Sequence, residues 1–179
     1  MSRALIIVDV QPTFCEGGAL AVQGGNAIAE AVARFVDEHR GDYALIATTQ
    51  DWHIDPGTHF SDSPDFVDTW PPPEAELPPA LARVNAQVSV KKGQYEAAYS
   101  GFEGTTEDGK TLEQALRDAG ITDVDVVGLA ESHCVASTAI DAAHAGFATR
   151  VLSDLTVPVS EELGKAAREK MRTEGVTLV

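Results

Sequence analysis

Cys134 is the residue of this chain best placed to act as a nucleophile. It follows a strand-like run where helical spacing begins, in the passage Gly128-Leu129-Ala130-Glu131-Ser132-His133-Cys134-Val135. A thiolate, and not a thiol, attacks a carbonyl carbon. The N-terminus of a helix favours an anion, and its backbone N–H groups can hold an oxyanion. We therefore expect a lowered thiol pKa at Cys134. The alternative is a buried cysteine that serves as a small hydrophobic residue.

Asp9 and Lys92 have the chemistry that a cysteine nucleophile needs beside it. Asp9 lies at the end of the first strand-like run, and Lys92 ends the third. A carboxylate can take the thiol proton as a general base, and an ammonium group can hold both anions in place. Each residue could instead be structural, with Asp9 capping a helix and Lys92 lying in solvent. Cys15, in the loop after the first strand, is expected to be inert.

Asp51, His53 and His59 form a candidate metal site. Side chains at positions i and i+2 of an extended chain point to one side, so Asp51 and His53 can share an ion. The Pro56-Gly57 turn can bring His59 back towards them. Two imidazoles and a carboxylate suit Zn²⁺, Fe²⁺ or Mn²⁺ and leave positions open for other ligands. The alternative is that these side chains only cap turns of the loop.

The elements that must position these residues alternate between strand and helix. Strands are expected at 4–10, 43–49, 87–91, 124–129, 149–152 and 176–179, and helices at 26–40, 111–119, 134–145 and 160–173. This alternation predicts an α/β fold, an open and mostly parallel six-stranded sheet with helices on both faces. Such Rossmann-like sheets bind ligands at the carboxyl ends of their strands, where the candidate residues lie.

Composition limits the classes of partner. The chain has 179 residues, 44% of them hydrophobic, which predicts a single domain over 1–179. Its formal charge of -15 argues against nucleic acid and anionic membranes as partners. We find no signal peptide, no membrane span and no disulfide pattern among two cysteines, so the cytoplasm is expected. The segment 51–86 has little periodicity and is predicted to be a functional loop.

Several short motifs follow one another in a fixed order along the chain. They are Leu5-Ile6-Ile7-Val8-Asp9-Val10-Gln11 with Phe14, Thr49-Gln50-Asp51-Trp52-His53, His59-Phe60, Trp70-Pro71, Lys92-Gly93, Ala98-Tyr99-Ser100-Gly101-Phe102 and Ser132-His133-Cys134-Val135. Together they resemble the nicotinamidase/pyrazinamidase branch of the isochorismatase-like cysteine hydrolases, over nearly the whole chain. The resemblance implies hydrolysis of nicotinamide and pyrazinamide to the acid and ammonia through a cysteine thioester, a reaction of NAD salvage.

The resemblance also implies a role for each matching residue. By this likeness Asp9, Lys92 and Cys134 are the catalytic triad, Asp51, His53 and His59 are the metal ligands, Phe14, Trp70, Tyr99 and His133 line an aromatic pocket, and the backbone N–H groups of Ala130 and Cys134 form the oxyanion hole. It further implies a cis peptide between Leu129 and Ala130, and one divalent metal ion (Zn, Fe or Mn) that binds the ring nitrogen of the substrate.

One departure from the family pattern affects the metal. The family has a further histidine ligand shortly after the Trp-Pro pair, but here Trp70 is followed by Pro71-Pro72-Pro73-Glu74, and no histidine occurs from 60 to 132. Either the loop is short in this protein, or residues after Pro72 are missing from the sequence as given. With a short loop, three protein ligands hold the metal and its affinity is reduced.

Two other functions fit part of the pattern. A related amidohydrolase acting on a carbamoyl or ureido substrate would share Asp9, Lys92 and Cys134 but would not need the metal cluster. A non-catalytic binding protein on the same fold would be expected to lose a member of the triad, and none is lost. An isochorismatase proper would not need the cysteine. The sequence leaves open whether the protein is a monomer or a homo-oligomer.

Overall fold

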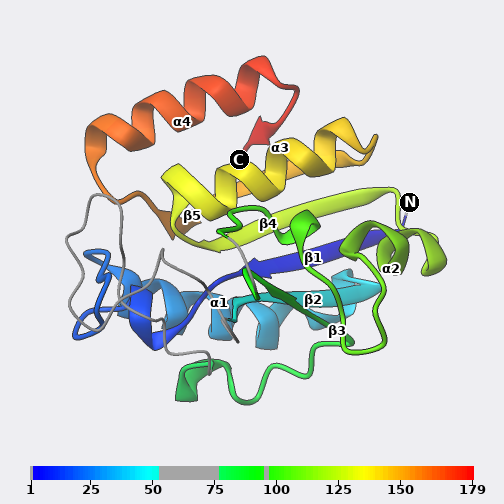
Figure 1. Ribbon diagram of the computed structural model, residues 1–179, viewed down its shortest axis with the longest axis horizontal. Helices are drawn as coiled ribbons and strands as arrows, with labels where there is room; N and C mark the ends of the chain where they lie inside the picture. Colours follow the sequence, from blue (N-terminus) through cyan, green and yellow to red (C-terminus); the bar gives the residue numbers. More distant parts are fainter. Residues whose placement is uncertain (1, 53–76, 95–96) are drawn as a thin grey trace.

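A single parallel sheet organises the part of the chain that this computed structural model describes, residues 2–52, 77–94 and 97–179. The strand order is β3-β2-β1-β4-β5-β6, and each neighbouring pair is parallel (Figure 1). The strands are β1 (Arg3–Val8), β2 (Leu45–Asp51), β3 (Val88–Lys92), β4 (Asp123–Leu129), β5 (Ala148–Val157) and β6 (Thr177–Leu178). The predicted open parallel sheet is therefore confirmed.

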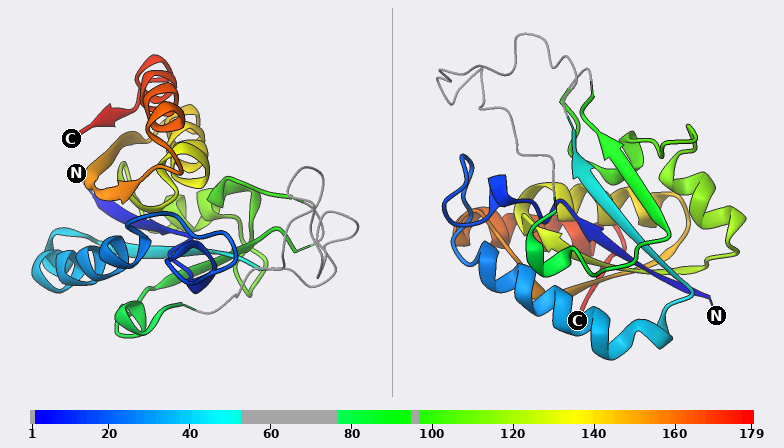
Figure 2. Two further views of the ribbon diagram at one scale, coloured as in Figure 1. Left: turned by 90° about the vertical axis from the view of Figure 1, so that its left-hand side faces the viewer. Right: turned by 90° about the horizontal axis from the view of Figure 1, so that it is seen from below.

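Helices cover both faces of the sheet, as predicted (Figures 1 and 2). They are α1 (Gly25–His39), α2 (Leu112–Asp118), α3 (Ala136–His144) and α4 (Glu161–Thr173). Side chains of β1 alternate between the faces, as the two-residue repeat of a strand requires. Ile6 packs with residues of α2, α3 and α4, while Ile7 packs with residues of α1. Strands covered on both faces become continuous apolar runs, which explains the pattern of β1.

Helix ends agree with the local signals in the sequence. Thr111 caps α2 in a reciprocal box with Gln114, and the Ser160 hydroxyl accepts a hydrogen bond from the Leu163 N–H at the start of α4. Gly120 and Gly146 follow α2 and α3 with positive φ, the conformation that favours glycine. The expected helix at 134–145 begins differently, because a π-helical turn, η6 (Glu131–Val135), precedes α3.

β5 is longer than the run expected at 149–152. It continues to Val157 because its pairing with β4 shifts register between Val126 and Gly128 and then resumes. Gly128 lies at this shift with φ +116°, and a Cβ there would lie 2.2 Å from the carbonyl oxygen of Val8 in the neighbouring β1, so the position favours glycine. The extension carries the chain to the carboxyl edge of the sheet, from which α4 starts.

Candidate active site

Asp9 lies directly after β1 and is fully buried. Its φ is +45°, a left-handed conformation that is uncommon outside glycine and that Asp tolerates better than most residues. The Asp9 N–H donates to the Thr49 carbonyl oxygen at 3.2 Å, and the Thr49 hydroxyl donates to Asp9 Oδ1 at 2.6 Å. β2 thereby holds one carboxylate oxygen and leaves Oδ2 for another partner.

Lys92, the last residue of β3, supplies that partner and joins the candidate residues. Its Nζ lies 2.8 Å from Asp9 Oδ2, 3.5 Å from Asp51 Oδ1 and 3.9 Å from Cys134 Sγ, and donates to the Ala98 carbonyl oxygen at 2.9 Å. Burial acts to lower the pKa of Lys92, but the charges of Asp9, Cys134 and Asp51 outweigh it and raise the pKa above its usual range. The ammonium therefore stays charged.

Cys134 lies in η6 with its Sγ 3.9 Å from Lys92 Nζ, but the expected lowering of its thiol pKa is wrong. Burial is the main cause that raises this pKa well above its ordinary value, and the charge and hydrogen bond of Asp9 raise it further. The Lys92 ammonium lowers it without overcoming them. The residue itself is half-buried. In the free protein the proton therefore stays on the sulfur until a base removes it.

The turn that carries the nucleophile has an unusual backbone. The peptide between Leu129 and Ala130 is cis, which confirms that expectation. The Ala130 carbonyl oxygen then accepts hydrogen bonds from the N–H groups of His133, at 3.0 Å, and Val135, at 3.2 Å. This compact turn aims Cys134 at the carboxyl ends of the central strands. The oxyanion hole of Ala130 and Cys134 N–H groups stays a prediction.

Asp51 is the one predicted metal ligand within the described residues; His53 and His59 lie outside them. Its backbone is clamped by Gln11, whose side chain accepts from the Asp51 N–H at 2.8 Å and donates to its carbonyl oxygen at 3.1 Å. The Asp51 side chain is 14% exposed. Residues 2–52, 77–94 and 97–179 contain no cluster of three or more ligand side chains. A carboxylate at this edge, followed by two imidazoles in sequence, is nevertheless a donor set that suits a divalent metal.

Two of the predicted pocket residues face each other near the nucleophile. The ring centroids of Tyr99 and His133 are 6.1 Å apart, and Tyr99 is 53% exposed. Burial lowers the pKa of His133, so this imidazole is neutral near pH 7. Phe14 is half-buried in the turn η1 (Pro12–Phe14) that follows Asp9. Trp70 lies outside the described residues.

Three groups at the site were missed in the sequence. They are the Thr49 hydroxyl on Asp9, the Gln11 amide on Asp51 and the Ala98 carbonyl on Lys92. One signal could have indicated the first: Thr48, Thr49 and Gln50 are polar residues that follow the apolar start of β2, and all three are buried. Cys15 is free and 3% exposed, and burial raises its thiol pKa, which agrees with an inert residue.

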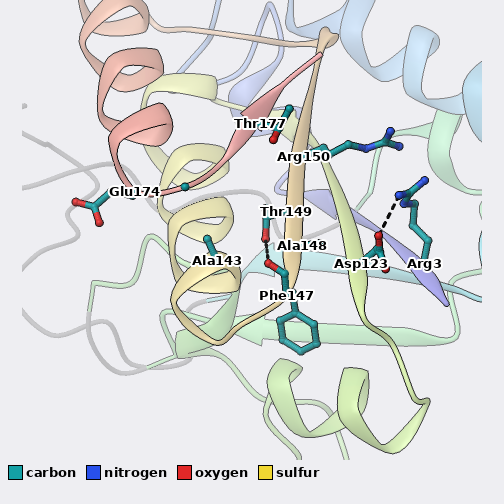
Figure 3. A pocket seen from close by; sticks show the side chains of 10 residues that line it. Arg3, Asp123, Ala143, Phe147, Ala148, Thr149, Arg150, Glu174 and Thr177 are labelled. Atoms are coloured by element: carbon teal, nitrogen blue, oxygen red, sulfur yellow. Dashed lines mark hydrogen bonds and ion pairs between the residues drawn. The ribbon is translucent and has the colours of Figure 1, made fainter. Parts of the chain in front are cut away.

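A separate cavity of about 400 Å³ lies at the opposite, amino end of the strands (Figure 3). Arg3, Asp123 and Arg150 are among its lining residues. Its cations are already paired, since Arg3 binds Asp123 at 3.2 Å and Arg150 binds the buried Asp125 at 2.6 and 2.7 Å. The cavity contains none of the residues that carry the candidate chemistry.

Comparison with known proteins identifies the family of this site. Residues 3–179 match the isochorismatase domain. The chain belongs to the isochorismatase family. It is 51% identical to the nicotinamidase/pyrazinamidase of Mycobacterium tuberculosis, with 99% of this chain and 98% of that protein covered. That alignment spans 183 positions, more than the 179 residues here, so the relative carries residues that this chain lacks.

Solved structures agree with this assignment. The pyrazinamidase of Pyrococcus horikoshii, in complex with zinc, superposes with a TM-score of 0.83 at 33% identity and covers 100% of this chain and 99% of its own. The yeast nicotinamidase bound to the inhibitor nicotinaldehyde has a TM-score of 0.82 at 25% identity, with 99% of each chain covered. This isochorismatase-family chain thus shares its whole fold with amide hydrolases.

Proposed function

We propose that this protein is an amidohydrolase that converts nicotinamide, and pyrazinamide, to the acid and ammonia. The observation that carries the proposal is the convergence on Lys92: its ammonium touches Asp9 and Cys134, which come from different strand ends. A base, a thiol and a cation in one buried cluster are the groups that acyl transfer through a cysteine requires. The 51% identity to the M. tuberculosis enzyme supports the choice of substrate.

The first half of the reaction forms a thioester. Asp9 accepts the proton of the Cys134 thiol, and the thiolate attacks the carboxamide carbon, forming the C–S bond. The backbone N–H groups of Ala130 and Cys134 hold the oxyanion in this proposal. Asp9 then gives its proton to the amide nitrogen, the C–N bond breaks, and ammonia leaves. The raised thiol pKa makes the base essential, because the sulfur keeps its proton in the free protein.

The second half of the reaction releases the acid. Asp9, again a carboxylate, takes a proton from water, and the oxygen of that water attacks the thioester carbon. The C–S bond breaks, the acid forms, and the proton held by Asp9 returns to the sulfur. Lys92 stays charged throughout and stabilises Asp9 and the leaving thiolate in turn. Asp9 thus passes each proton on within the same half-reaction, first from the sulfur to the leaving ammonia and then from water to the sulfur.

We propose that Asp51, His53 and His59 hold one divalent metal ion, Zn, Fe or Mn. When bound, such an ion supplies an open coordination position that a pyridine or pyrazine nitrogen can fill. The zinc in the P. horikoshii relative supports this proposal. In the protein itself, Gln11 fixes the backbone of Asp51 and so sets where its carboxylate lies. Phe14, Trp70, Tyr99 and His133 are proposed to contact the ring of the substrate.

The chain is proposed to act as one domain over residues 1–179, in the cytoplasm. Both cysteines are free, which suits a reducing compartment. Among the residues described, no helix has the length and apolar character needed to cross a bilayer. Small carboxamides are the proposed partners.

Ammonia release from purified protein tests the function. With a divalent metal added, nicotinamide and pyrazinamide should be hydrolysed, and benzamide, which lacks the ring nitrogen, should be much poorer. If benzamide turns over as well as nicotinamide, ring recognition through the metal is wrong. If ureido or carbamoyl compounds are hydrolysed and nicotinamide is not, the proposed substrate is wrong while the triad stands.

A further inference from the structure

An ion pair joins the last helix to the turn that carries the nucleophile. Glu131, the first residue of η6, is 4% exposed although it carries a carboxylate. Arg168 of α4 donates from Nη1 to both of its oxygens, at 2.9 and 3.0 Å. The two residues are 37 positions apart, so the contact exists only because α4 packs beside this turn.

The surroundings of the pair favour this arrangement over a chance surface contact. Gly164 lies inside α4, where glycine is disfavoured relative to alanine. A Cβ at position 164 would lie 2.7 Å from Pro158 Cγ and 3.1 Å from Arg168 Nη1. The missing side chain therefore leaves room for the guanidinium group. A second link is close by, since the Val159 N–H donates to the Ser132 hydroxyl at 3.2 Å.

We infer that Arg168 and Glu131 position Cys134 for the proposed amide hydrolysis. Glu131 lies three residues before the nucleophile and is bonded to a helix outside the triad. Without Arg168, the carboxylate of Glu131 is left buried without its cation, and turning it towards water moves the turn. Because Cys134 Sγ must stay aligned with Asp9 and Lys92, a shift of about 1 Å can lower turnover by about 100-fold.

Four variants and a matched control test the inference. Arg168→Met removes the charge and keeps the length of the side chain, and we expect kcat for nicotinamide to fall about 10- to 100-fold with little change in KM. Arg168→Lys should lose less. Lys165→Met removes an exposed cation from the same helix and should behave as wild type. Glu131→Met should lose less than Arg168→Met, because Arg168 is 28% exposed and can reach water.

The decisive variant is the double substitution Glu131→Met with Arg168→Met. Replacing a buried ion pair by apolar side chains of similar size is often tolerated, whereas removing one partner is not. The double variant should therefore regain at least about tenfold in kcat over Arg168→Met. Equal kcat for Arg168→Met and Lys165→Met would overturn the inference, as would a double variant no better than Arg168→Met. If Arg168→Met does not fold, a folded and active double variant supports the inference, and an unfolded one overturns it.

Hydrogen–deuterium exchange gives a readout that needs no substrate. Amides of residues 130–135 should exchange faster in Arg168→Met than in Lys165→Met, while those of β1 stay protected. Unchanged exchange in this turn would overturn the positioning role. If wild-type protein does not hydrolyse nicotinamide but the exchange changes as expected, the proposed function fails and the inference about the turn stands.

Discussion

At the amino end of the sheet Asp125 is buried against two arginines, whereas at the carboxyl end Asp9 is buried against one lysine. Asp125 receives two hydrogen bonds from Arg150 and one from the Tyr43 hydroxyl, with Arg3 Nε 3.6 Å away. Burial, followed by the bond to Asp125, raises the pKa of Tyr43, so the phenol stays neutral. These groups satisfy the Asp125 carboxylate, and none of them is a thiol.

The carboxyl end has the same kinds of group in a different balance. Within the described residues, the carboxylates of Asp9 and Asp51 both contact the ammonium of Lys92. The same ammonium donates to the Ala98 carbonyl oxygen and lies 3.9 Å from the Cys134 sulfur. The buried ion pair at the amino end is structural, whereas the pair at the carboxyl end lies beside a thiol and can take part in chemistry.

The largest expected effect is loss of the nucleophile. Cys134→Ala should reduce turnover of nicotinamide by more than about 10³-fold, since the thioester can no longer form. Cys15→Ala is the matched control and should stay largely active, because Cys15 packs in the core away from the triad. The measurement is ammonia release at saturating substrate. Near wild-type ammonia release by Cys134→Ala protein would refute the assignment.

Removing one cation from each end tests the comparison directly. Lys92→Met should reduce kcat by more than about 100-fold and destabilise the protein by about 3–5 kcal/mol, because it leaves the buried carboxylate of Asp9 without a charged partner. Arg150→Met should lower the unfolding temperature while the folded fraction keeps its kcat. Thermal unfolding and steady-state kinetics on both variants separate the two effects. A normal kcat for Lys92→Met would contradict a catalytic role for the ion pair at the carboxyl end.

Chelation should affect activity without affecting the triad. If only the three proposed ligands hold the metal, it should dissociate readily, since loss of even an outer-shell partner typically costs about 10–100-fold in affinity. Protein treated with chelator should lose nicotinamide hydrolysis and regain it on addition of Zn²⁺, Fe²⁺ or Mn²⁺. Metal content by elemental analysis and ammonia release are the measurements. Metal that survives prolonged chelation would show that the ligand set is larger than proposed.

Removing the Thr49 hydroxyl, which donates to the proposed general base Asp9, should have a smaller effect on kcat. Thr49→Val removes the donor to Asp9 Oδ1, and loss of such a hydrogen bond should lower kcat about 10-fold. Thr49→Ser should recover most of that loss. At the other end, Tyr43→Phe removes the hydroxyl from Asp125 and should cost about 1 kcal/mol of stability without changing kcat. An equal loss of kcat in Thr49→Val and Tyr43→Phe would contradict the view that only the carboxyl end of the sheet takes part in catalysis.

The raised thiol pKa predicts the pH dependence of labelling. Because the folded protein binds the Cys134 proton more tightly than the unfolded chain, the thiolate fraction at a given pH is lower in the folded protein. Iodoacetamide should therefore alkylate Cys134 more slowly in native protein than in urea-unfolded protein at pH 8.5, and the native rate should rise with pH. Peptide mass mapping measures both rates. Faster native labelling would show that Lys92 outweighs burial.

The sequence by itself determined the order of elements and predicted which three side chains meet at the carboxyl edge of the sheet. Continuous apolar runs become strands buried on both faces, and glycines after helical spacing end helices, because these preferences act over a few residues. Asp9, Lys92 and Cys134 could be singled out since parallel strands bring their carboxyl ends to one edge. The cis peptide at Leu129–Ala130 followed from the family resemblance and not from local preference.

Only the tertiary structure decided which groups support that triad and how its charges balance. Thr49 meets Asp9 because β2 lies beside β1, and Arg168 meets Glu131 because α4 packs on the nucleophile turn. The direction of the Cys134 pKa shift was predicted wrongly, because burial and a neighbouring carboxylate outweigh the effects of the helix terminus and the lysine. These contacts and the thiol pKa depend on strand order, register and burial. Each of these is set by residues that are far apart in the sequence.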